Sequence, residues 1–264
     1  MEKVIRIFFI LILITTNLFS QQKNSPQLTC DIKKGEASIW YLFHSGWAVK
    51  TQKHFLIFDY LENFTEGATR MLENGYINPK EITDQNVIVF ISHAHTDHYD
   101  PVILSWKDKI PNITYVWGWP EETESKKYYF DSVRKVINVG DLKVYNIHHE
   151  FDGISESAFL INVDGLWIFH AGDHGHSKGE SNKIFKNNIG YLASLYDELD
   201  IMFTPTFGGE FYAIQQLSPH IVFPMHDGGH ENQYYKFAQK VNSRGLEVKV
   251  GVAKERGDNF FYKR

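Results

Sequence analysis

The sequence predicts an α/β protein in which packed β-sheets are flanked by helices. Short apolar runs with strand character recur along the chain from residue 37 onward. These runs follow one another closely in the first half, with helices interspersed, whereas strand and helix alternate near the end. The 264 residues contain no internal repeat, low-complexity tract or obvious linker, so we expect one large domain.

The expected strands are runs of six or seven residues rich in Val, Ile, Leu, Phe and Tyr. They cover residues 37–43, 55–60, 86–92, 113–118, 142–147, 157–163, 166–171, 200–205, 220–225 and 246–252. Asp164 and Gly165 separate two of these runs, and an Asp-Gly pair in this position is typical of a two-residue hairpin turn. Helices are expected at residues 67–74, 101–109, 188–198 and 232–243.

The first twenty residues have the pattern of a secretory signal. Lys3 and Arg6 precede an unbroken apolar run from Ile7 to Ile14, and more polar residues follow it. We predict a signal peptide at residues 1–20, cleaved after Ser20, one mature domain at residues 21–264, and a periplasmic or secreted protein. An uncleaved membrane anchor is the alternative, but the apolar run is shorter than the roughly 20 residues that span a bilayer. No stable membrane span is expected after cleavage.

Charge and cysteine content exclude several classes of protein. The formal net charge of −5 and the scattered Lys and Arg residues argue against a protein that binds nucleic acid through a basic face. Cys30 is the only cysteine, so no intrachain disulfide can form. A metal site in this chain would therefore use imidazole and carboxylate ligands.

The loop "HAHTDH" contains four candidate metal ligands within six positions: His93, His95, Asp97 and His98. It follows the strand expected at 86–92 and precedes the helix expected at 101–109, which begins with Pro101. In an extended loop, His93 and His95 project to the same side, whereas the adjacent Asp97 and His98 must turn toward different positions. This arrangement suits two neighbouring metal ions better than a single tetrahedral ion.

Further candidate ligands follow other apolar runs, each just before a turn-like stretch. We expect them to gather with the histidine-rich loop along one sheet edge, where seven ligands in all would serve two ions. These candidates are His148 and His149 in "NIHHE", of which one would serve, Asp173 in "HAGD" and His226 in "PMH".

These motifs resemble those of the metallo-beta-lactamase superfamily, with "HAHTDH" matching its His-x-His-x-Asp-His signature. The resemblance extends in order across most of the chain through "HSGWAV", "LIFDY", "HAGD" and "PMH". It is greatest to the branch that contains ascorbate phosphate lactonase and N-acyl phosphatidylethanolamine phospholipase D. The resemblance implies a four-layer αββα sandwich, an α/β fold in which the site lies at the open edge.

The resemblance also implies how the ligands are divided between two metals. The first would take His93, His95 and either His148 or His149. The second would take Asp97, His98 and His226, and Asp173 would bridge the two ions. Asp97 and Asp173 would be the two carboxylates of the catalytic site. Neighbouring strand residues point to opposite faces, so one of the two adjacent histidines ligates. We favour His149, because Val144 and Ile147 then fit the strand that leads to it.

Other polar and aromatic residues have expected places around this site. Asp59 is expected to orient a ligand rather than bind metal, and His170 to face away as a strand residue. His174, His176 and His230 are expected behind the ligands, in the pocket or at the surface. Several aromatic residues could line a pocket rim, although core packing explains each at least as well. They are Trp47, Trp117, Trp119, Phe211 and Tyr212.

The expected chemistry is metal-dependent hydrolysis. Two divalent ions, best zinc but alternatively manganese or iron, would supply a metal-bound hydroxide that cleaves an ester, lactone, amide or phosphodiester bond. The substrate would be a small or lipid-like molecule. A true beta-lactamase is disfavoured, because such enzymes generally lack the bridging carboxylate expected of Asp173. The alternatives are a di-iron oxidoreductase on the same fold and a non-catalytic periplasmic metal-binding protein.

Overall fold

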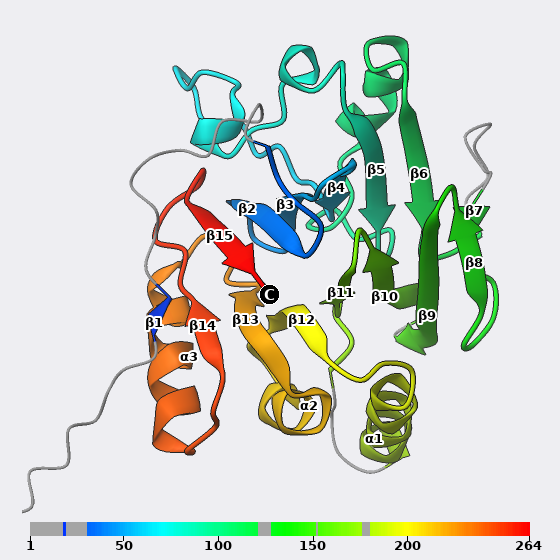
Figure 1. Cartoon of the computed structure of the whole chain (residues 1–264), viewed down its shortest axis with the longest axis vertical. Coiled ribbons are helices and arrows are strands. Elements are labelled where there is room, and N and C mark those ends of the chain that lie inside the picture. The colour runs from blue at the N-terminus through cyan, green and yellow to red at the C-terminus, as the bar shows by residue number, and fades with distance from the viewer. Residues whose placement is uncertain (1–17, 20–30, 121–127, 152, 176–179) are drawn as a thin grey trace, which may run out of the picture.

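The computed structural model describes residues 18–19, 31–120, 128–151, 153–175 and 180–264. Two mixed β-sheets pack face to face in this part of the chain (Figure 1). The seven-stranded sheet has the order β15-β2-β3-β4-β5-β6-β7 and the eight-stranded sheet the order β1-β14-β13-β12-β11-β10-β9-β8. The predicted packed sheets are therefore confirmed.

The strands of each sheet have the following bounds. The seven-stranded sheet contains β2 (Glu36–Phe43), β3 (Gly46–Lys50), β4 (His54–Phe58), β5 (Asn86–Ile91), β6 (Ile113–Trp117), β7 (Tyr128–Tyr129) and β15 (Asn259–Lys263). The eight-stranded sheet contains β1 (Leu18–Phe19), β8 (Val136–Val139), β9 (Leu142–Phe151), β10 (Ile154–Val163), β11 (Leu166–His170), β12 (Leu199–Pro205), β13 (Pro219–Met225) and β14 (Lys249–Gly251).

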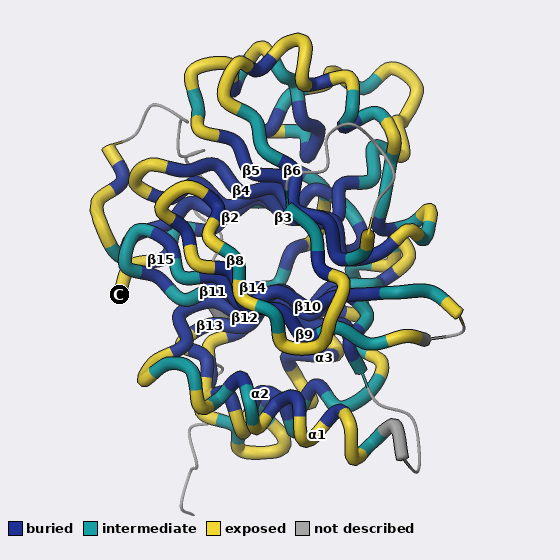
Figure 2. The backbone as a smooth tube through the Cα atoms, turned by 90° about the vertical axis from the view of Figure 1, so that its right-hand side faces the viewer, coloured by how far each residue is buried: buried dark blue, intermediate teal, exposed yellow. Residues whose placement is uncertain are grey.

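Helices cover the outer face of the eight-stranded sheet. They are α1 (Glu180–Ala193), α2 (Glu210–Leu217) and α3 (Asn232–Ser243), and their buried side chains join the core between the sheets in one apolar cluster. In α1 these are Phe185, Ile189 and Leu192, a spacing that places them on one helix face. Figure 2 shows the strands largely buried and the helices exposed on the side away from the sheets.

The outer face of the seven-stranded sheet is covered by loops and short 3₁₀ helices. These helices span Leu72–Asn74, Pro79–Glu81 and Pro101–Asp108, and they contribute Leu72, Ile103 and Trp106 to a second apolar cluster on this face. The predicted four-layer sandwich is therefore present, with one helical layer made of 3₁₀ rather than α-helices.

The predicted elements agree with the structure most closely where the local signal is strongest. Each of the ten expected strands overlaps an observed one, and the helix expected at 232–243 is α3. Asp164 and Gly165 form the hairpin turn between β10 and β11, both with positive φ, of +46° and +83°. These angles match the mirror-image turn that Asp-Gly favours, so the hairpin prediction is confirmed.

Three helix predictions need correction. The segment 67–74 is helical only at Leu72–Asn74, because Gly75 ends that turn in the left-handed region at φ +72°. The segment 101–109 forms a 3₁₀ helix, and the segment 188–198 is the last part of α1, which begins at Glu180 and ends at Ala193. Helix α2 was not predicted, because its eight residues are too few to show a clear helical period.

The predicted signal peptide, residues 1–20, lies outside the described residues apart from Leu18 and Phe19. These two residues pair in parallel with Val250 and Gly251 of β14. None of the helices in the described part of the chain has the length and hydropathy that a bilayer span requires.

Candidate metal centre

Five of the predicted ligands come together between the ends of strands from both sheets. His93, Asp97 and His98 follow β5 of the seven-stranded sheet, whereas Asp173 follows β11 and His226 follows β13 of the eight-stranded sheet. The expectation that one sheet edge would carry all the ligands is therefore wrong. The site forms where the two sheets meet, so packing of the sandwich decides its geometry.

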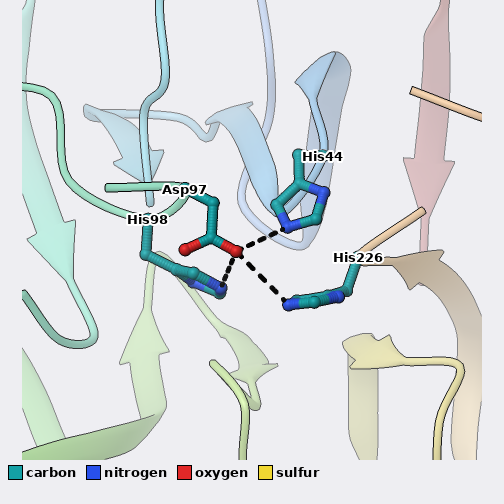
Figure 3. A group of neighbouring side chains, drawn as sticks. All are labelled: His44, Asp97, His98 and His226. Carbon is teal, nitrogen blue, oxygen red and sulfur yellow. Dashed lines mark ion pairs between the residues drawn. The ribbon is translucent and has the colours of Figure 1, made fainter. Parts of the chain in front are cut away.

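Asp97 lies at the centre of one group of converging side chains (Figure 3). Its Oδ2 atom lies 3.9 Å from Nε2 of His98 and 3.7 Å from Nε2 of His226. The same oxygen lies 3.3 Å from Nε2 of His44, a residue in the turn between β2 and β3. A carboxylate and three imidazoles thus face a common point.

Asp173 joins this group to a second one that includes His93. Its Oδ2 atom lies 3.7 Å from Nε2 of His93. Its Oδ1 atom lies 3.2 Å from Nε2 of His98 and 3.3 Å from Nε2 of His226. One carboxylate oxygen therefore faces each side of the centre, the arrangement expected of a carboxylate that bridges two cations.

Asp59 lies behind the centre and determines which imidazole nitrogens face it. Its Oδ2 atom lies 2.8 Å from Nδ1 of His98, so the carboxylate accepts a hydrogen bond from Nδ1–H and leaves a lone pair on Nε2. Ser92 donates its backbone N–H and its hydroxyl to Asp59, both at 2.7 Å. Asp59 therefore orients His98, as expected, and the role of His98 as a metal ligand stays a prediction.

Ser92 orients His93 in the same way. Its hydroxyl donates to Asp59, so the hydroxyl oxygen, 2.9 Å from Nδ1 of His93, accepts a hydrogen bond from the N–H of that nitrogen. Nε2 of His93 therefore also presents a lone pair to the centre.

The side chains fit a metal centre because several of their inward-facing polar atoms lack a hydrogen-bond partner. Nε2 of His93, Nε2 of His98 and Oδ1 of Asp173 are buried, and among the described residues none has a hydrogen-bond partner. Unsatisfied buried polar atoms are rare in proteins, and several converging on one point indicate a ligand that satisfies them together. Imidazole nitrogen and carboxylate oxygen without sulfur suit zinc, manganese or iron.

Electrostatics favours a cation at this point. Burial would raise the pKa of Asp173, but His226 and His98 outweigh it and hold that pKa well below its usual range. Burial would lower the pKa of His98, yet the neighbouring carboxylates of Asp173 and Asp59 raise it well above the ordinary value. Burial lowers the pKa of His93 to about 4, which keeps this imidazole neutral at pH 7. The carboxylates that hold a proton on His98 would equally attract a divalent cation.

The remaining predicted ligands are not in the converging groups. The ring of His95 lies 4.7 Å from that of His93, edge to face, at the rim of the centre. Nε2 of His149 lies 3.6 Å from Glu156, and its Nδ1 lies 3.1 Å from Nδ1 of His174, whereas Nδ1 of His148 lies 3.3 Å from Ser157. The third histidine of the first metal thus stays a prediction, with His148 and His149 on opposite strand faces.

His170 does not face away from the site, contrary to the prediction. It is fully buried between the sheets, stacked on Phe58, with Nδ1 3.9 Å from Asp59. The end of β11 lies between the two sheets, so the side chain of His170 is enclosed. The alternation of residues along this short strand does not indicate that position. His174 is buried behind His149. His230 is exposed, and His176 lies outside the described residues.

The aromatic residues mostly belong to the core. Trp47 and Trp117 are fully buried, and Phe211 stacks on Phe237. Phe207 is half exposed and lies edge-on to the ring of His226, with the centroids 4.8 Å apart, so this residue walls the centre instead.

The sequence-based prediction missed His44 as a site residue. The motif "HSG" that contains it was noticed only as part of a strand opening. His44 could have been identified because it comes directly after an apolar strand, the same context that identified His226.

Comparisons with known proteins point to one family. Residues 38–226 match the family model described as a beta-lactamase superfamily domain, a range that includes His44 and every predicted ligand. A UPF0173 metal-dependent hydrolase from Pyrococcus abyssi is 25% identical over 207 residues, covering 70% of this chain and 82% of the relative.

Solved structures show the same fold. Igni18, a metallo hydrolase from Ignicoccus hospitalis, superposes with a TM-score of 0.62 at 20% identity, covering 87% of this chain and 99% of its own. CmlA, a diiron beta-hydroxylase from Streptomyces venezuelae, gives a TM-score of 0.55 at 10% identity, covering 88% of this chain and 55% of its own.

Proposed function

The chain belongs to the beta-lactamase superfamily, and from that premise we propose that it is a metal-dependent hydrolase with a two-metal site. One observation carries the proposal: the unpartnered nitrogens of His93 and His98 converge on a carboxylate, Asp173, that faces both sides of the centre. The name of the Pyrococcus abyssi relative, a metal-dependent hydrolase, supports the same class of reaction.

The proposed ligands are the predicted ones. His93, His95 and either His148 or His149 would hold the first metal, Asp97, His98 and His226 would hold the second, and Asp173 would be shared by both. Bound divalent ions, zinc in first place, supply a water of lowered pKa and polarise the bond under attack. Asp59 and Ser92 keep the imidazole lone pairs directed inward, and Phe207 shields one side of the centre from solvent.

The proposed substrate is a small or lipid-like molecule with an ester, lactone, amide or phosphodiester bond. Ser92 contacts His93 and His98, but its hydroxyl donates to Asp59 and lies on the Nδ1 side of both rings, away from their inward-facing Nε2 atoms. This supports direct attack by water without a covalent enzyme intermediate. Hydrolysis in ¹⁸O-labelled water would then place the label in the product acyl or phosphoryl group in a single turnover.

The decisive experiment measures metal content and turnover on the same samples. We expect about two equivalents of metal per chain by elemental analysis, loss of turnover of an ester and phosphodiester panel on chelation, and recovery with zinc or manganese. One equivalent in fully loaded protein would contradict the two-metal site. Turnover that survives chelation would contradict metal-dependent hydrolysis.

Two alternatives are outcomes of the same experiment. The likeness to CmlA extends to the fold alone, but this donor set does not select sharply between zinc and iron. Iron in the native protein with oxygen-dependent turnover would identify an oxidoreductase. Metal without turnover of any substrate would identify a metal-binding protein.

Export remains part of the proposal. Cleavage after Ser20 would remove β1, so the mature protein would lack the pairing of Leu18 and Phe19 with β14. Amino-terminal sequencing of protein from the native host should find Gln21 as the first residue, and an intact Met1 would contradict export by cleavage.

A further inference from the structure

His44 is fixed in an unusual conformation at the edge of the centre. Its backbone lies in the left-handed region at φ +53°, which non-glycine residues seldom adopt and which clusters at functional sites. Its N–H donates to the hydroxyl of Tyr41 at 2.9 Å. Its carbonyl accepts from the N–H of His226 at 3.2 Å and from the hydroxyl of Tyr234 at 3.0 Å. The turn is therefore anchored to the loop that carries His226.

The ring of His44 has its proton on the nitrogen that faces the centre. The backbone N–H of Gly228 lies 3.0 Å from Nδ1 of His44, and a backbone N–H can only donate. Nδ1 must therefore accept, and in the neutral imidazole the proton resides on Nε2.

This Nε2–H points into the centre, where it forms no well-aligned hydrogen bond. It is buried and, among the described residues, lacks a hydrogen-bond partner of good geometry, although Oδ2 of Asp97 lies 3.3 Å away. The side chain is 6% exposed, and its ring lies 4.2 Å from the ring of His226 (Figure 3). A buried donor without a partner is costly, so we expect a ligand to supply the acceptor.

The contrast with the neighbouring histidines separates a donor from a metal ligand. Behind His93 lies a hydroxyl and behind His98 a carboxylate, and each accepts a hydrogen bond from Nδ1–H, so Nε2 presents a lone pair. Behind His44 lies a donor, so Nε2 presents a proton. To bind metal through Nε2, His44 would need a proton on Nδ1 facing the N–H of Gly228.

We propose that His44 is a catalytic residue that donates a hydrogen bond from Nε2 to the substrate oxygen on which negative charge develops during hydrolysis. The proposal rests on the proposed function, since it assigns a role within the same centre. No proton is transferred in this role. The donor stabilises charge on the oxygen of the acyl or phosphoryl group under attack, as donors in oxyanion holes do.

The test compares His44→Ala and His44→Gln with a matched control, His220→Ala. His220 is an exposed histidine near the start of β13, at the opposite end of that strand from His226. We expect all three variants to retain the metal content of the wild type and the same absorption spectrum with bound cobalt. We expect kcat of His44→Ala to fall about 10²- to 10³-fold with a small change in KM. His44→Gln can still accept from Gly228 and donate inward, so it should recover part of the rate.

A second measurement reads the tautomer directly and does not depend on turnover. Long-range ¹H–¹⁵N spectra of the zinc-loaded wild type should show His44 protonated at Nε2 and not at Nδ1. The opposite tautomer, a lost metal equivalent in His44→Ala, or an altered cobalt spectrum would make His44 a ligand and overturn the proposal. Unchanged kcat in His44→Ala would also overturn it.

These outcomes differ from a failure of the proposed function. A wild type that binds metal but hydrolyses nothing would contradict hydrolysis and, with it, the catalytic role of His44. The tautomer and metal measurements would still decide whether His44 is a donor or a ligand. If His44→Ala does not fold, His44→Gln and the wild-type spectra supply the test.

Discussion

Two buried histidines beside carboxylates lie at opposite ends of β4 and β5, and their ring nitrogens differ in their hydrogen-bond partners. His54 begins β4, with Nδ1 3.0 Å from Asp164 and Nε2 2.9 Å from Asp141, so both ring nitrogens have partners. His98 follows β5, with Nδ1 held by Asp59 and Nε2 unpartnered. Burial and acidic neighbours are common to both. An inward-facing nitrogen without a hydrogen bond distinguishes the metal centre from the structural cluster.

The largest expected effect comes from removing the carboxylate shared by the two sides of the centre. Asp173→Ala should lose one metal more readily than the other and lower kcat on the order of 10³-fold or more, because Asp173 faces His93, His98 and His226. Elemental analysis and initial rates measure both effects. Wild-type metal content in this variant would show that Asp173 does not bridge.

A smaller effect is expected from the group behind the centre. Asp59→Asn keeps the shape but weakens the acceptor for His98 and Ser92, so metal affinity should fall about 10- to 100-fold. Competition with a chromophoric chelator measures this affinity. Asp164→Asn is the matched control at the other end of the strands, and an equal loss of affinity in both variants would erase the distinction between the two clusters.

The structural cluster should affect stability instead. Asp164 accepts hydrogen bonds from Thr51 at 2.7 Å and from the N–H of Lys53 at 2.8 Å in addition to its contact with His54. His54→Ala leaves the buried carboxylate without one partner, so the free energy of unfolding should fall by about 1–3 kcal/mol. Urea unfolding measures this change. Metal content should stay at the wild-type level, and a loss of metal would link the two ends of the sandwich.

The smallest expected effect is a dependence of stability on acid pH. Burial would raise the pKa of Asp164, but hydrogen bonds from His54 and Thr51 outweigh it and lower the pKa to about 2. The stabilisation is therefore complete above the unfolded-state pKa of about 4 and is lost as pH falls through about 2. Urea unfolding of the wild type and Asp164→Asn should differ less at pH 2.5 than at pH 5. A constant difference would contradict a charged Asp164 in the fold.

Local patterns predicted the strands and the hairpin because their physical causes are local. A buried strand needs a run of apolar residues, and the turn at Asp164 and Gly165 needs two residues that tolerate positive φ, so both are visible in short windows. The same reasoning failed for α2, which has eight residues, and for the beginning of α1, which starts at Glu180 rather than at residue 188 and ends at Ala193 rather than at residue 198.

The sequence by itself determined which side chains could form a metal centre, since "HAHTDH", "HAGD" and "PMH" place imidazoles and carboxylates directly after strands. Only the tertiary structure decided which of them meet. His44 and His226 become neighbours because the turn after β2 and the loop after β13 belong to different sheets that pack face to face. The tautomer of His44 depends on a backbone N–H from that distant loop, Gly228, and a contact between segments so far apart in the chain leaves no trace in any local pattern.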